Sequence, residues 1–306
     1  MIVALAVVLA AAGAYAGCGP WLSRALPPAP AVRLLAPTGL LLTATVWFGL
    51  AVAAFTWIGQ DAEIAALGPW SAQALRSQAP VPWAVSAAAA TALAVSAAGA
   101  ALFLVRRLRA MRLAHRHCGR LGAPGALVVL DTDVPDAFTT PEVAGRVVVT
   151  RGMLRALPGD ERAALLAHER SHLRHRHAWW NLAVDLAAAA NPTLRPTRRA
   201  LHNSVERWAD EDAASRLGDR ALIARAVARA ALVRQRHVRT ATTGVAGGDV
   251  PGRVRALLDP PVSRWPPAVA VLAVILAAST LGAATLDHQG ERLFEHVAVG
   301  QQAARH

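Results

Sequence analysis

The segment Ala167-His168-Glu169-Arg170-Ser171-His172-Leu173 contains the pattern H-E-x-x-H, which decides how the rest of this 306-residue chain is interpreted. On a helix, histidines four residues apart lie on one face, so both imidazoles reach a single metal ion. Glu169 lies beside them and can take a proton from a water molecule, as a zinc hydrolase requires. Such a pattern arises by chance in about one or two chains of this kind per hundred, so the surrounding sequence has to decide.

The surroundings predict that the motif lies on a helix. Pro158-Gly159-Asp160 is a helix start with Asp160 as a good N-cap, and leucines follow at helical spacing. The flank 170–177 is too polar for hydrocarbon, so we expect the site at or just below a membrane surface. His175 and His177 do not follow the motif's spacing, and we expect them to be solvated. The extended zinc motif with a third histidine is excluded, because position 178 is Ala.

A third protein ligand must therefore come from elsewhere, and a carboxylate from a second helix is a common solution. Glu206 and Asp210 are four residues apart, hence on one helical face, and prolines at 192 and 196 allow a fresh helix to begin before them. One carboxylate can bind the metal while the other supports a ligand imidazole. Spacing alone does not say which does which, and a solvated acidic turn is the alternative.

The composition predicts an integral membrane protein. Hydrophobic residues make up 54% of the chain and the mean hydropathy is +0.33, above the range of ordinary soluble domains. Four uncharged stretches are long enough to cross a bilayer, which takes about 20 helical residues. They are Met1–Leu22, Leu34–Gln60, Val81–Val105 and Ala268–Leu286. An uncharged start makes the first stretch a better anchor than a signal peptide.

The arginines predict the orientation, because basic residues near span ends are retained in the cytoplasm. The first loop has Arg24 and Arg33 without an acid, whereas the second has Asp61 and Glu63 against Arg76. The strongest basic clusters are residues 106–120 and 253–264. We therefore expect both termini outside, and three regions: a three-helix membrane region at 1–106, a cytoplasmic domain at 107–264, and a fourth span with a short tail at 265–306.

The formal charge of +12 could indicate nucleic-acid binding. The arginines gather beside the spans, however, where the lipid bilayer is the nearer partner, and the chain carries no DNA-binding motif. We expect no nucleic-acid partner. Two cysteines permit neither a disulfide framework nor a cysteine metal site.

The amino-acid composition changes between residues 125 and 150, from alanine-rich segments to short runs of β-branched residues. Leu127–Leu130 and Arg146–Thr150 read as strands, the second of them at an edge, and 133–142 with its two prolines reads as a loop. Farther on, Arg220–Arg239 predicts a helix, and Thr240–Gly252, polar and glycine-rich, predicts a linker. The fold class is mostly α, with about four transmembrane helices and an α+β zincin-like domain between the third and fourth.

Several stretches together resemble the membrane-embedded gluzincin metallopeptidases, the group that contains the HtpX heat-shock protease, the CAAX prenyl protease and the BlaR/MecR antirepressor peptidases. They are Asp136-Ala137-Phe138, Val147–Leu154, Ala167–Leu173 and Glu206-Arg207-Trp208-Ala209-Asp210. The resemblance implies one Zn²⁺ per chain, with Glu206 as third ligand beside His168 and His172, and Asp210 as the supporting carboxylate. Four spans resemble the BlaR/MecR module most closely, but only about 20 residues follow Leu286, so we expect no penicillin-binding sensor domain.

These observations predict a zinc metalloendopeptidase of the cell membrane, with Glu169 as the catalytic base. The expected partner is a protein or peptide substrate, such as a transcriptional repressor or a damaged membrane protein. The substrate is expected to add a strand along Val147, Val148, Val149 and Thr150. The alternative is a non-catalytic membrane receptor or scaffold, in which zinc only stabilises the fold.

Overall fold

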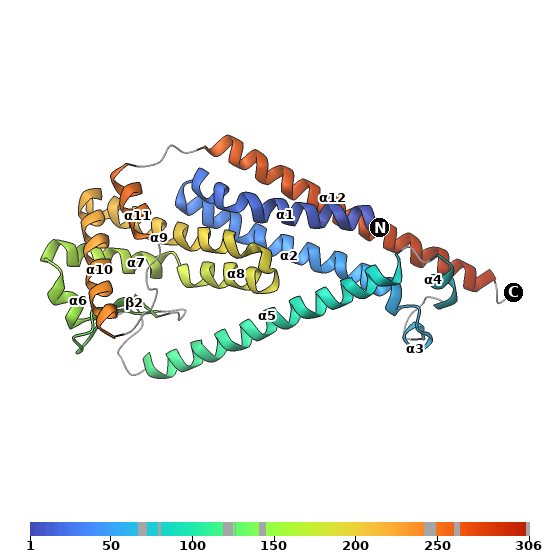
Figure 1. Cartoon of the computed structure of the whole chain (residues 1–306), viewed down its shortest axis with the longest axis horizontal. Coiled ribbons are helices and arrows are strands. Elements are labelled where there is room, and N and C mark those ends of the chain that lie inside the picture. Colours follow the sequence, from blue (N-terminus) through green and yellow to red (C-terminus); the bar gives the residue numbers. More distant parts are fainter. Residues whose placement is uncertain are drawn as a thin grey trace.

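A computed structural model describes residues 1–66, 72–78, 81–118, 125, 127–140, 145–241, 249–259 and 264–303. The structure is mostly helical, and four long helices run side by side (Figure 1). They are α1 (Ile2–Ala25), α2 (Pro28–Ile58), α5 (Trp83–Cys118) and α12 (Trp265–Ala303). By length and composition, each of them has a segment that can cross a membrane, which confirms the predicted four spans. Short helices α3 (Ala62–Ala65) and α4 (Ala72–Gln78) lie between α2 and α5.

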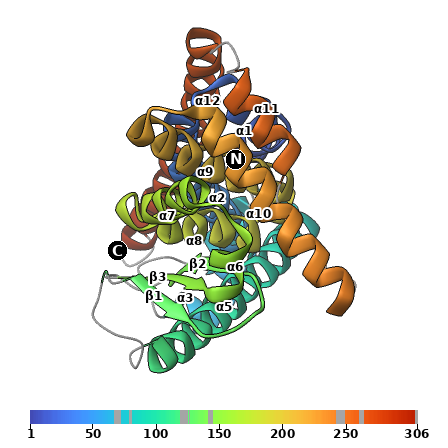
Figure 2. The same cartoon turned by 90° about the vertical axis from the view of Figure 1, so that its left-hand side faces the viewer.

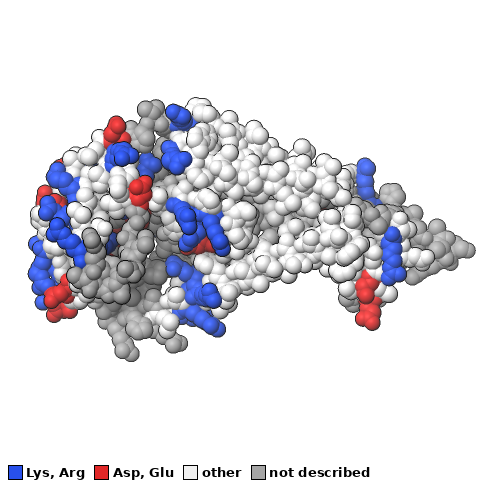
Figure 3. All heavy atoms as spheres, in the orientation of Figure 1, with Lys and Arg blue, Asp and Glu red and all other residues white. Residues whose placement is uncertain are grey.

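The span helices form an apolar bundle with few polar contacts inside it. Tyr15 of α1 donates a hydrogen bond of 2.5 Å to the carbonyl oxygen of Leu35 on α2, which satisfies a buried hydroxyl. The surface of the midsection is almost free of charged residues, which gather at the two ends of the molecule (Figure 3). This distribution fits a bilayer around the midsection.

A helical hairpin outside the four spans also packs against the bundle. It consists of α8 (His177–Ala190), a short 3₁₀ turn (Pro192–Leu194) and α9 (Arg195–Leu217). Val184 and Leu201 of the hairpin share one core with Tyr15 and Leu35, and Ser96 of α5 donates a hydrogen bond to the Ala190 carbonyl. Part of the predicted cytoplasmic region therefore lies against the spans. The boundary predicted at residue 106 falls inside α5, which is continuous to Cys118.

The small sheet has three strands in the order β1-β3-β2. The strands are β1 (Leu127–Leu130), β2 (Ala137–Thr139) and β3 (Val147–Thr150). β3 pairs in parallel with β1 and antiparallel with β2. Two predictions are wrong here: β3 is the central strand instead of an edge strand, and the expected loop contains β2. Residues 141 and 142 of that loop lie outside the described part of the chain.

The motif helix lies between the sheet and the hairpin (Figure 2). This helix is α7 (Gly159–Arg174), and it follows the short α6 (Arg151–Ala156). Leu165 of α7 packs with Val149 of β3, while Ala164 and Ala167 pack with Ala213 of α9. Asp160 is not the N-cap as predicted, because the helix begins at Gly159 and Asp160 accepts from the next backbone N–H within the first turn.

Two further helices cover the domain. They are α10 (Arg220–Ala241), as predicted, and α11 (Val250–Leu258). The linker expected at Thr240–Gly252 is wrong at its end, since Val250–Gly252 form the first turn of α11, capped by Asp249, whose side chain accepts a hydrogen bond of 2.9 Å from the Gly252 N–H. Residues 242–248 of the expected linker lie outside the described residues.

Candidate metal centre

The first half of the centre comes from α7. His168 and Glu169 are buried and His172 is nearly so, because α7 is covered by the sheet on one side and by α9 on the other. The two histidines are one helical turn apart, and their Nε2 atoms lie 3.1 Å from each other. Both nitrogens therefore point at the same place.

Glu206 of α9 completes the set. Its carboxylate oxygens lie 3.6 Å from Nε2 of His168 and 3.7 Å from Nε2 of His172. Ligand atoms about 2.0 to 2.1 Å from a tetrahedral zinc ion are about 3.3 Å apart, close to all three distances. These three residues could hold a metal ion, and the donor set of two imidazoles and one carboxylate fits Zn²⁺ with one coordination position left open.

The Nδ1 atoms of both histidines, which face away from the centre, also have partners. Nδ1 of His168 lies 2.9 Å from a carboxylate oxygen of Asp210, which is itself only 2% exposed. Nδ1 of His172 is 2.9 Å from Nδ1 of His177, so one of these two nitrogens donates to the other. The prediction that His177 is solvated is wrong: it is buried, since the chain turns back after α7 and packs it against Trp208. Such contacts fix the orientation of ligand imidazoles.

Arg253 of α11 is a site residue that sequence reasoning missed. It donates two hydrogen bonds of 2.7 Å to the carboxylate of Asp210, and its third nitrogen lies 3.0 Å from Glu206. Its side chain is only 12% exposed. In the sequence it counts only as one of several arginines near the last span, and no spacing rule links it to α9. Only the packing of α11 on α9 reveals its role.

The charges around the site favour a cation between the histidines. Burial alone would lower the pKa of His168, but the carboxylates of Asp210 and Glu206 raise it to about 10. Burial and the charge of His168 lower the pKa of His172 to about 4. Burial would raise the pKa of Glu206, yet the two histidines and Arg253 hold it below its usual range. The carboxylates of Asp210 and Glu206 thus stabilise a positive charge between the two histidines, and a bound metal ion would supply this charge.

Glu169 differs from Glu206 and Asp210, which pair with His168 and Arg253, because burial outweighs the other influences on the pKa of its carboxylate. It is 6% exposed, and burial raises its pKa above the ordinary value. The charges of His168 and Arg234 oppose this rise without cancelling it. A carboxylate with a raised pKa is a stronger base, which suits proton transfer.

The strand predicted to receive a substrate cannot do so. β3 is paired on both sides and all four of its residues, Val147, Val148, Val149 and Thr150, are buried. The outer strand next to α7 is β2. In an antiparallel pair, alternate residues hydrogen-bond to the neighbouring strand. Asp136 and Thr140 bond to β3 or to the residue before it, so the N–H and C=O groups of Ala137 and Thr139 point away from β3. At Ala137 this outward carbonyl accepts a hydrogen bond from Arg234 of α10.

The fold and the site together define the class of protein: a multi-pass membrane protein with a helical domain that carries a candidate metal centre of metalloprotease type. Residues 105–243, a little under half of the chain, match the model of Peptidase family M48. This match contains the three candidate ligands and Glu169, and ends before Arg253.

Curated relatives agree with the family match. The chain is 45% identical over 69 residues to a "Protease HtpX homolog" of Aeropyrum pernix, covering 22% of each chain. It is 43% identical over 68 residues to one of Thermoplasma acidophilum, covering 22% of this chain and 20% of the relative. The chain thus matches about a fifth of the length of these relatives. No solved structure matches. The likenesses support a membrane metalloprotease of HtpX type.

Proposed function

We propose that this protein is a membrane-bound zinc endopeptidase that hydrolyses peptide bonds of protein substrates at the cytoplasmic face of the membrane. The observation that carries the proposal is the convergence of His168 Nε2, His172 Nε2 and the Glu206 carboxylate, with both imidazoles held from behind. A bound Zn²⁺ would polarise the scissile carbonyl and lower the pKa of a water molecule, so that this water can be deprotonated and attack at neutral pH.

The chain's own residues then perform the remaining steps. Glu169 takes the proton from the attacking water and passes it to the nitrogen of the leaving amine. Asp210 and His177 keep the two imidazoles in the orientation that presents Nε2 to the centre. Burial of the site excludes bulk water, which strengthens each of these electrostatic contacts.

The substrate is proposed to pair with the free edge of β2. This strand lies next to α7, and the outward N–H and C=O groups of Thr139 can bond an extended peptide. A cytoplasmic location rests on the arginine-rich end of α5 and on Arg253, Arg255 and Arg264 before α12. A regulatory protein such as a transcriptional repressor, or a damaged membrane protein, is the proposed substrate class. That the chain is related to the BlaR/MecR peptidases is also part of this proposal.

The test compares purified wild-type protein with Glu169→Gln, using zinc content by elemental analysis and cleavage of casein or of the chain itself. We expect one zinc per chain in both, with cleavage reduced at least about 100-fold in Glu169→Gln, because the base is lost. Glu161→Gln is the matched control: it removes another buried carboxylate of α7, one that pairs with Arg229 outside the site. Zinc bound with cleavage indifferent to Glu169 would indicate a structural metal site in a receptor.

A further inference from the structure

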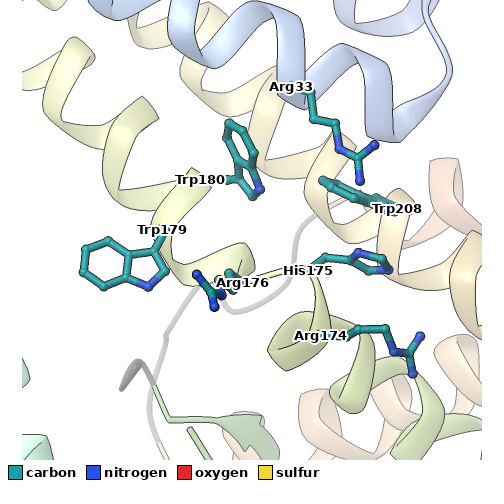
Figure 4. A pocket seen from close by; sticks show the side chains of 7 residues that line it. All are labelled: Arg33, Arg174, His175, Arg176, Trp179, Trp180 and Trp208. Carbon is teal, nitrogen blue, oxygen red and sulfur yellow. The ribbon is translucent and has the colours of Figure 1, made fainter. Parts of the chain in front are cut away.

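A cavity lies outside the metal centre, where the start of α2, the turn between α7 and α8, and α9 meet. Its volume is about 440 Å³. Its lining is unusual in having only cationic and aromatic side chains: Arg33, Arg174 and Arg176, Trp179, Trp180 and Trp208, and His175 (Figure 4). We call it the headgroup cavity.

The headgroup cavity lies beside the start of the uncharged stretch of α2. Arg33 is the one charged residue of α2, and the uncharged stretch of that helix begins at the next residue. Trp180 packs on one side against the apolar core of the bundle, and on the other against Val32 and Trp208. Trp179 is 44% exposed. Tryptophans with one apolar and one wet side are typical of the membrane interface.

The cavity carries positive charge, and within the described residues only part of this charge is paired with a carboxylate. The Arg33 guanidinium lies 4.7 Å from the centre of the Trp208 ring. The His175 ring is next to the same Trp208 ring, with the two ring centres 4.8 Å apart (Figure 4). Arg174 pairs with Asp212 at 2.5 Å, and Nε2 of His175 lies 3.3 Å from the same carboxylate.

In the part of the chain that the structure describes, Arg33 and Arg176 form no ion pair with a carboxylate. Arg33 lies over the Trp208 ring, and Arg176 occupies the turn between α7 and α8 with φ 53°. The guanidinium groups of Arg33 and Arg176 therefore have N–H groups available to bind a ligand.

We propose that the headgroup cavity binds the phosphate group of an anionic phospholipid. Guanidinium groups bind phosphate oxygens through two parallel N–H···O bonds, so Arg33 and Arg176 supply the ligand's ion pairs. Trp179 and Trp180 pack against the glycerol and the first acyl carbons. A lipid headgroup fits the site better than a soluble phosphate, because one wall continues into the apolar bundle through Trp180. Basic pockets beside spans are known to bind such headgroups.

The experiment titrates the purified full chain with phosphatidylglycerol, or with phosphatidylcholine of the same acyl chains, and counts bound lipids by native mass spectrometry. The test variant is Arg33→Gln/Arg176→Gln. The matched control is Arg195→Gln/Arg199→Gln, which removes two exposed arginines of α9 outside the cavity. Each arginine near an anionic surface contributes about fivefold to binding, so we expect phosphatidylglycerol to bind about 25-fold more weakly to the test variant and unchanged to the control.

If the double variant does not fold, Arg176→Gln alone leaves α2 intact and is expected to weaken binding about fivefold. Inorganic phosphate, added as a competitor at millimolar concentration, distinguishes a soluble anion from the lipid and is expected to leave the bound lipid in place. Equal losses in the test and control variants, or no preference for phosphatidylglycerol in the wild type, would overturn the proposal. Displacement of the lipid by inorganic phosphate would overturn the lipid as its source.

Discussion

Arg253 donates hydrogen bonds of 2.7 Å to both carboxylate oxygens of Asp210, and through this carboxylate it reaches the metal centre, because Asp210 lies 2.9 Å from Nδ1 of His168. Its remaining nitrogen lies 3.0 Å from Glu206. One side chain from α11 therefore fixes both carboxylates that α9 contributes. A buried carboxylate that loses such a partner is left with an unpaired charge, which is costly.

Arg253→Ala is expected to lower zinc affinity about 10- to 100-fold, as changes in residues that support metal ligands do. It is also expected to lower the free energy of unfolding by about 3 kcal/mol, because the charge of Asp210 stays buried. Competition with a chromophoric zinc chelator measures the first effect and thermal unfolding in detergent the second. Arg255→Ala, at an exposed position on the same helix, is the control and should change neither quantity.

A double-mutant cycle tests whether Arg253 acts through Asp210. We expect Asp210→Asn to weaken zinc binding about 10- to 100-fold on its own. The combined variant Asp210→Asn/Arg253→Ala should bind zinc about as well as the weaker single variant, since residues in direct contact are not additive. Losses that simply add in the cycle would show that Arg253 acts through Glu206 or through the fold at large.

The pH dependence of zinc binding follows from the two histidines. Below about pH 10 the metal-free centre holds a proton on His168, and zinc must displace it, whereas His172, with a pKa of about 4, is already neutral. One proton is therefore released per zinc bound between about pH 5 and 9. We expect the apparent zinc affinity to fall tenfold for each unit decrease in pH across that range. Chelator competition at several pH values measures the slope, and a slope of zero or two contradicts the assignment.

Thr139→Pro tests the proposed substrate strand. Proline removes the Thr139 N–H, which points away from β3, so the sheet keeps its own hydrogen bonds. If a substrate pairs with β2, the lost hydrogen bond should lower kcat/KM about tenfold through KM, with zinc content unchanged. Thr139→Val keeps the N–H and should retain wild-type kinetics. An unchanged KM in the proline variant would place the substrate elsewhere.

Part of this picture was accessible from local sequence alone. The four spans are continuous apolar runs, and hydrocarbon thickness imposes their length whatever the neighbours are. The placement of His168, Glu169 and His172 on one helix follows from a period of 3.6 residues, which a local pattern contains. The strands Leu127–Leu130 and Val147–Thr150 are β-branched runs and were predicted to within one residue.

Other features depended on contacts that no local pattern records. β2 is three residues long, too short for its sequence to show the alternation of a strand, and it reads as a loop. Its strand conformation depends on pairing with β3. His177 reads as a solvated residue of a basic helix end, yet the turn at Arg176 buries it behind His172. The α8–α9 hairpin has the composition of a domain segment, but it packs on the span bundle through Val184 and Leu201.

The sequence by itself determined the membrane spans, the motif helix and the chemistry that its residue types permit, because these depend on composition and on periodicity within one element. Only the tertiary structure decided that β3 is closed to a substrate, that Arg253 holds Asp210 and approaches Glu206, and that arginines and tryptophans from four helices surround one cavity. These features join residues far apart in the chain, and their positions depend on how whole elements pack, which no short stretch of sequence specifies.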